Sequence, residues 1–274
     1  MMIFNNRKRA AIMLALIALF IGIIAVSGYF LKDAAMVTDF SRKNLSPCVK
    51  FLFGTDWMGR DMLARTLCGL SLSIRLGLLT AVVSAVFALI LGTLSAVLGK
   101  TADSIVTWFI DLIMGIPHIL LLILISYACG KGFWGIVIGI VFTHWMSLAR
   151  VIRGEIIQLR ESIFIKASRK LGLSTIEITV KHILPHVLPQ FAVGLILLFP
   201  HAVLHEASIT FLGFGLSPEQ PAIGIILSES MRYLATGQWW TAFFPGALLV
   251  ITVMLFDLAG KLIRMLFDPS SSHK

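Results

Sequence analysis

The chain has 274 residues, of which 58% are hydrophobic and only 14% are charged, and its mean hydropathy is +0.92. Water-soluble domains are about 45–50% apolar and about 25% charged, so this composition excludes an ordinary soluble enzyme. The net charge of +9 does not indicate a nucleic-acid-binding protein. Its basic residues lie mostly in loops between apolar runs and form no stripe with interleaved aromatic residues.

Several apolar runs are long enough to cross a bilayer, which takes roughly 18 or more consecutive apolar residues. The first run follows a basic cluster at 7–9 and precedes no small-residue cleavage site, which predicts an uncleaved anchor. The sequence therefore predicts an all-α integral membrane protein with six transmembrane helices, at about 10–31, 72–98, 104–128, 133–150, 187–210 and 240–262.

The loops divide the chain into three parts. Residues 1–71 hold the first helix and an extracytoplasmic segment, 72–262 form the core, and 263–274 form a cytoplasmic tail. More Lys and Arg fall in the loops that share a side with the N-terminus. The positive-inside rule therefore predicts that both termini, and the long inner loop 151–186, face the cytoplasm.

The inner loop has the pattern of a helix, a turn and a second helix. Residues 163–171 favour a short helix, and Gly172 can supply a tight turn. Ser174 and Glu177 have the spacing of a capping box, and Pro185 is expected to restart the chain toward the next span. Two interpretations remain open: a basic amphipathic anchor on anionic lipid, or a docking surface for a cytoplasmic partner.

The same loop resembles the signature loop of permease subunits in binding-protein-dependent ABC importers, of the peptide and nickel family. The matching positions are 166–168, Gly172 and the His-Ile-Leu-Pro end at 182–185, although Lys166 replaces the usual Glu and Ser168 the second Ala. The resemblance covers nearly the whole chain. Its other motifs are Phe53 to Asp61, Glu206 to Gly215, Phe244-Pro245-Gly246, Asp268-Pro269, and Asp111 with Pro117 in the third span, where Trp108 stands in place of a common Arg.

The resemblance implies the type I ABC importer permease fold, in a bacterial inner membrane. It also implies the partners: a homologous second permease, two ATP-binding subunits, an extracytoplasmic substrate-binding protein and membrane lipid, with no nucleic acid. The chain has no phosphate-binding loop, so it is expected to be non-catalytic and to bind no cofactor, while the partner subunits use ATP and Mg²⁺. The residues expected to couple to the ATPase are Ile165, Lys166, Ala167, Ser168, Leu171, Gly172 and Leu173, with Ile165, Leu171 and Leu173 as anchors.

Histidines within the predicted spans suggest the cargo. His201 and His205 are four residues apart and share a helix face, whereas Glu206 is turned about 100° away. Imidazole suits nickel, copper and zinc. We therefore expect His144, His201, His205 and Glu206 on the translocation path, with His201 and His205 as transient metal ligands. His118 is expected only to pack.

The resemblance makes nickel or a nickel chelate the first expectation for the cargo, with a di- or oligopeptide as the alternative. From another class, a secondary transporter or channel stays the runner-up, although the sequence lacks the internal repeats that such proteins often show. A zinc hydrolase is excluded, because His205-Glu206 begins a His-Glu-x-x-His motif that ends in Ile209.

Overall fold

The computed structural model describes residues 3–267, with side chains from residue 7 to 266. The Asp268-Pro269 motif and the tail beyond residue 267 lie outside the described residues. The described chain is helical, apart from turns and one isolated bridge between Thr55 and Asp61. The long helices are α1 (Ile3–Phe30), α3 (Met62–Val97), α6 (Gly132–Arg160), α9 (Leu184–Phe211) and α11 (Trp240–Phe267). The shorter elements are α2 (Lys32–Met36), η1 (Phe40–Arg42), α4 (Lys100–Met114), α5 (His118–Ala128), α7 (Ile163–Lys170), α8 (Thr175–Ile178), η2 (Thr179–Ile183), α10 (Ile223–Met231) and η3 (Leu234–Thr236).

Five described helices are long and apolar enough to cross a membrane, and the pair α4 and α5 brings the number to six if it counts as one bent span. The prediction of an all-α protein is thus confirmed, and the prediction of six spans holds when α4 and α5 are counted as one span. Leu70, Ile152 and Val203 lie in one buried core, which joins α3, α6 and α9. Apolar side chains on the outer faces of α1 and α11, such as Leu16 and Met254, are exposed, as lipid-facing positions are.

The third predicted span is not the continuous helix that the sequence suggested. The structure breaks it at residues 115–117, and α4 and α5 meet at a bend of 96°. Pro117 is the cause, because proline has no N–H to continue the helix and disfavours helical geometry in the residue before it. The chain restarts as α5 at His118, directly after the proline.

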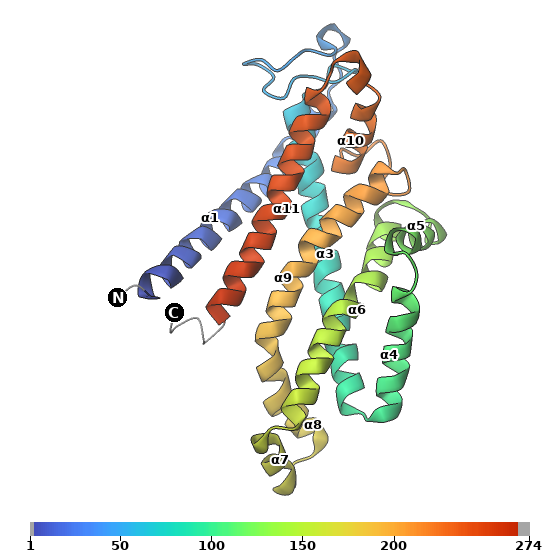
Figure 1. The fold of residues 1–274 in the computed structure, drawn as a ribbon. Coiled ribbons are helices and arrows are strands. Elements are labelled where there is room, and N and C mark those ends of the chain that lie inside the picture. The colour runs from blue at the N-terminus through green and yellow to red at the C-terminus, as the bar shows by residue number, and fades with distance from the viewer. Residues whose placement is uncertain (1–2, 268–274) are drawn as a thin grey trace.

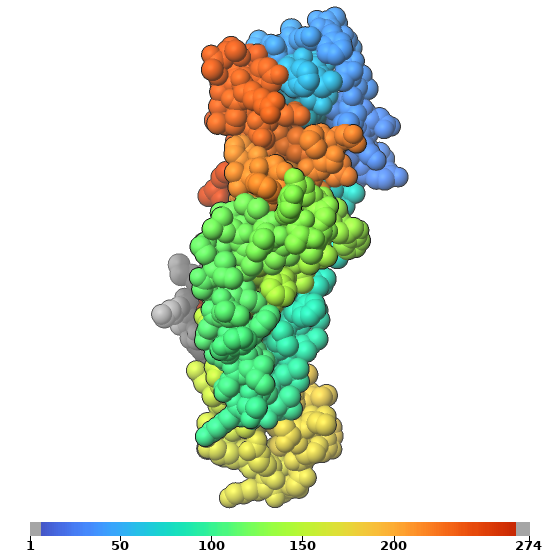
Figure 2. All heavy atoms as spheres, turned by 90° about the vertical axis from the view of Figure 1, so that its right-hand side faces the viewer, coloured from blue at the N-terminus to red at the C-terminus, as the bar shows by residue number. Residues whose placement is uncertain are grey.

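The molecule is elongated, with different structures at its two ends (Figure 1; Figure 2). The segment 37–61 lies at one end beside α10, while α7 and α8 lie at the opposite end. The predicted helix–turn–helix is confirmed there, with Gly172 at φ +88° and the capping box between Ser174 and Glu177 formed. Pro185 lies in the first turn of α9, where the next span was predicted to start. The helical segments before it continue into α9, so residues 175–211 are helical throughout.

Candidate functional site

The candidate site is a cavity of about 640 Å³ beside the break between α4 and α5. The break residues 115–117 form part of its wall, and His118, His144, His201 and His205 line it too. These histidines come from three helices, α5, α6 and α9, so the fold gathers residues that are as many as 87 positions apart in the sequence. The 96° bend brings His118, the first residue of α5, to this wall.

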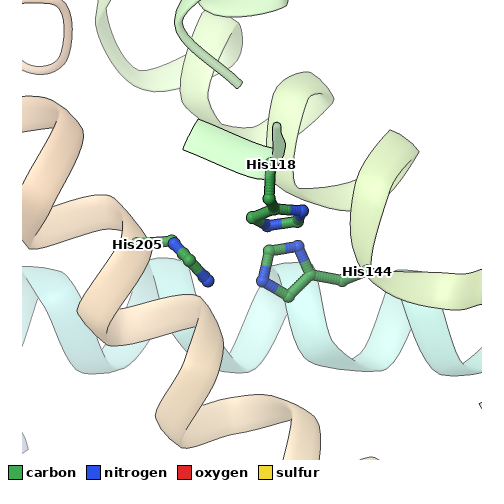
Figure 3. A group of neighbouring side chains, drawn as sticks. All are labelled: His118, His144 and His205. Atoms are coloured by element: carbon green, nitrogen blue, oxygen red, sulfur yellow. The ribbon is translucent and has the colours of Figure 1, made fainter. Parts of the chain in front are cut away.

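Three of these histidines face one another (Figure 3). One ring nitrogen from each of His118, His144 and His205 lies within 4.8 Å of those of the other two. The ring centroids are 5.0 Å apart for His118 and His144, 4.5 Å for His118 and His205, and 5.1 Å for His144 and His205. We call these three residues the histidine group. Their spacing is that of side chains able to share one metal ion.

The backbone of α6 sets the orientation of His144. Its Nδ1 lies 3.0 Å from the carbonyl oxygen of Ile140 and 3.1 Å from the Thr143 hydroxyl. Because a carbonyl can only accept, Nδ1 carries the proton and Nε2 keeps a lone pair. The buried Nε2 atoms of His118 and His144 have no hydrogen-bond partner among the described residues.

Residues 85–273 match the family described as "binding-protein-dependent transport system inner membrane component". The chain belongs to this permease family. It is similar to the dipeptide transport system permease protein DppC of Bacillus subtilis (strain 168), at 30% identity over 92% of this chain and 79% of the relative. It is also similar to the oligopeptide transport system permease protein OppC of the same strain, at 30% identity over 98% and 88% of the two chains. The family expectation is therefore confirmed, whereas the nickel-type branch is not.

The fold agrees with this family. The permease is similar to a chain of the structure titled "Inward facing conformations of the MetNI methionine ABC transporter", with a TM-score of 0.61 and 20% identity. The match covers 76% of this chain and 98% of that chain. The type I ABC importer permease fold that the sequence resemblance implied is thus confirmed.

The structure groups the candidate ligand residues differently from the sequence prediction. His201 and His205 both line the cavity, as their shared helix face predicted. However, the group of close nitrogens joins His205 to His118 and His144, and it does not include His201. His118, expected only to pack, belongs to the group. Sequence spacing identifies neighbours on one helix, but it carries no information about which side chains of other helices face them.

Glu206 does not line the cavity, although we expected it on the translocation path. It is fully buried against α3, where one carboxylate oxygen accepts a hydrogen bond of 2.5 Å from the Ser73 hydroxyl. The other accepts a bond of 3.0 Å from the Thr210 hydroxyl. The predicted turn of about 100° from His205 is the reason, because it directs Glu206 into the helix interface.

The candidate coupling residues occupy α7 and the turn after it. Leu171 is 82% exposed at the tip of the permease, but Ile165 is buried in the main core, so it is not available as an anchor for a partner. Ala167 is exposed, while Ser168 and Leu173 are half-buried. Lys166, which stands where the family has Glu, forms an ion pair of 2.8 Å with Glu161. That hydrogen bond lowers the pKa of the Glu161 carboxyl.

A charged network at the opposite end was missed by the sequence analysis. The Asp56 carboxylate accepts from the Arg60 and Arg65 side chains at 2.6 Å each, and both arginines also reach Glu229 on α10, at 3.2 and 3.0 Å. The motif 53–61 contains two of these residues, which was a signal that the segment is ordered. Nothing in the sequence connects it to Glu229, which lies 164 positions after Arg65.

Proposed function

We propose that this permease forms half of the translocation path of an ATP-driven importer for small peptide-like compounds. A homologous second permease supplies the other half, and an extracytoplasmic binding protein delivers the cargo. The observation that carries this proposal is the similarity to dipeptide and oligopeptide permeases over more than nine-tenths of the chain. It favours the peptide alternative of the sequence analysis over free nickel.

The permease itself is not an enzyme in this proposal. Two partner subunits bind and hydrolyse ATP with Mg²⁺, and the permease holds no cofactor of its own. The membrane is the bacterial inner membrane, with both termini and the α7–α8 end in the cytoplasm, as the distribution of Lys and Arg favours.

The α7–α8 end has the structure of a coupling element. Ile163, Leu171 and Ile176 are all more than three-quarters exposed there, where a groove of a partner can receive them. On the inner side, Ile165 and Ile178 are buried in the same core as α3, α6 and α9. A force applied to the exposed face is therefore transmitted to the helices that surround the cavity. Few side chains are expected to dominate such an interface.

The coupling proposal is tested with Leu171→Ser in the complete importer, reconstituted in liposomes with its binding protein and a mixture of dipeptides. We expect ATP-driven uptake to fall about tenfold or more, because one buried hot-spot side chain contributes about 2 kcal/mol or more to such an interface. The matched control is Leu98→Ser, since Leu98 is an exposed leucine (65%) in the turn between α3 and α4 at the same end. Equal uptake in both variants and the wild type would refute the role of Leu171.

A nickel chelate remains a second candidate cargo, favoured by one observation. The cavity has three imidazoles that converge on one point, and imidazole nitrogen is a suitable ligand for nickel. A peptide-like compound that carries a metal ion would satisfy both the family similarity and the histidine group.

A further inference from the structure

We propose that His118, His144 and His205 form a binding site for a divalent transition metal that enters the cavity already held by a small anionic chelator. Only the statement that this metal complex is cargo depends on the proposed function. The site itself follows from the side chains of this chain.

The geometry of the histidine group suits one ion. Bonds of about 2.0–2.1 Å from a metal to imidazole nitrogen place adjacent nitrogens roughly 2.9 Å apart around an octahedral ion and roughly 3.3 Å apart around a tetrahedral one. The three nitrogens already lie within 4.8 Å of one another, so modest side-chain rotations bring them to bonding distance. All three rings point into the same space between α5, α6 and α9 (Figure 3).

The hydrogen bonding of the group also favours a metal ligand. Metal-binding histidines usually donate their second ring N–H to a carbonyl or carboxylate, which fixes the ring and exposes the other lone pair. His144 does so through Nδ1 to Ile140. Buried polar atoms without partners are uncommon and destabilising, yet Nε2 of both His118 and His144 is in this state. A metal ion in the group would give both nitrogens a partner and would use the lone pair on Nε2 of His144.

The charge of the cavity decides between a free ion and a chelate. No acidic side chain lies among the described residues that line it, and Glu206 is directed away toward Ser73. Three neutral imidazoles leave the double charge of the ion uncompensated in a low-dielectric region, which is unfavourable. A chelator with carboxylates compensates that charge itself. Such a complex needs only two or three further ligands, which the histidine group supplies.

The position of the group on three helices makes its affinity depend on conformation. Any shift of α9 or of the bend before α5 changes the nitrogen distances, so the ion is held in one arrangement and released in another. Release is a requirement of transport, because sites on a path need to be weak enough to let the cargo leave.

The test measures metal binding directly, without ATP or the binding protein. The complete importer in lipid nanodiscs is titrated with nickel–nitrilotriacetate, which leaves two coordination positions open, and separately with Ni²⁺ alone, followed by visible absorption. We expect saturable binding of the nickel chelate, with an affinity at least tenfold higher than for Ni²⁺ alone. His118→Ala and His205→Ala should each weaken the binding of the chelate about tenfold or more.

The matched control is His186→Ala, which removes an exposed imidazole from the same helix, α9, at a position that does not line the cavity. It should change the affinity less than about threefold. His205→Gln keeps most of the side-chain volume and should match His205→Ala, which separates loss of a ligand from loss of packing. Chelate binding that is unchanged in His118→Ala and His205→Ala, or the absence of any saturable binding in the wild type, would overturn the proposal. Binding of Ni²⁺ alone that equals chelate binding would overturn its chelate part.

A failure of the metal-site proposal can be distinguished from a failure of the proposed function. If the importer binds metal through the histidine group but takes up no peptide-like compound, the metal site is supported and the proposed cargo is wrong. If the importer takes up dipeptides normally but binds no metal, the proposed function is supported and the metal site is wrong.

Discussion

Two polar regions of this permease differ in how their buried acceptor atoms are partnered, although Nε of Arg65, beside Asp56, also lacks a partner among the described residues. Asp56 is almost completely enclosed, and it accepts two hydrogen bonds from backbone N–H groups at 2.9 Å and two from arginine side chains at 2.6 Å. The histidine group lies at a hollow between helices, and the Nε2 atoms of His118 and His144 have no partner among the residues that the structure describes. Both regions draw residues from distant parts of the chain.

The difference distinguishes polar groups that stabilise the fold from polar groups that can bind a ligand. A buried charge with a complete set of partners stabilises the arrangement that holds it, and the removal of one partner is damaging. A polar atom that folding leaves unpaired stabilises nothing, so its position needs another explanation, such as a ligand. The network around Asp56 therefore holds the segment 53–61 on α3 and α10, whereas the histidine group is the part of the molecule that we propose binds a cargo.

The largest effect is expected for Asp56→Ala. It leaves Arg60 and Arg65 with only the Glu229 carboxylate, so we expect the free energy of unfolding to fall by about 3–5 kcal/mol. Chemical unfolding of the purified permease in mixed micelles measures this. Asp33→Ala is the control, because Asp33 is exposed and its removal should change stability by less than about 0.5 kcal/mol. A loss below about 1 kcal/mol for Asp56→Ala would mean that the network is not structural.

An intermediate effect is expected for Glu206→Gln. Glu206 resembles Asp56 in being buried with hydrogen-bond partners, because its carboxylate accepts from the Ser73 and Thr210 hydroxyls. The amide keeps the shape but replaces one acceptor with a donor, so we expect a loss of about 1–2 kcal/mol in the same unfolding assay. Uptake that collapses while stability is unchanged would instead return Glu206 to the translocation path.

The smallest effect on stability is expected for the double variant His118→Ala and His205→Ala. These changes enlarge a space that is already hollow and leave no new polar atom unpaired, so the free energy of unfolding should change by less than about 1 kcal/mol. The same micelle assay measures it, in the absence of added metal. A loss of about 3 kcal/mol or more would show that these side chains are structural, like Asp56.

The sequence predicted the parts of this structure that depend on local chemistry. The turn at Gly172 and the capping box of Ser174 and Glu177 involve residues a few positions apart, and the structure confirms both. Long apolar runs likewise predicted the spans, because each run is continuous in the sequence. The broken third span was missed because hydropathy measures length and composition, and it does not register the bend that Pro117 causes.

The site depended on contacts that the sequence does not encode locally. The shared helix face of His201 and His205 was a correct inference about α9. His201 as a metal ligand stays a prediction. The ring nitrogens that lie close to His205 belong to His118 and His144, which come from helices whose relative rotation is set by packing. Ile165 was expected to anchor a partner, but α7 turns that side chain into the core.

The central claim is that the histidine group receives a metal complex, and anomalous diffraction from crystals of the importer soaked in nickel–nitrilotriacetate tests it most directly. We predict a nickel peak between the three rings, with at least two of the nitrogens of His118, His144 and His205 about 2.0–2.1 Å from it. A well-occupied nickel peak elsewhere in the complex, with the three rings unliganded, would contradict the claim.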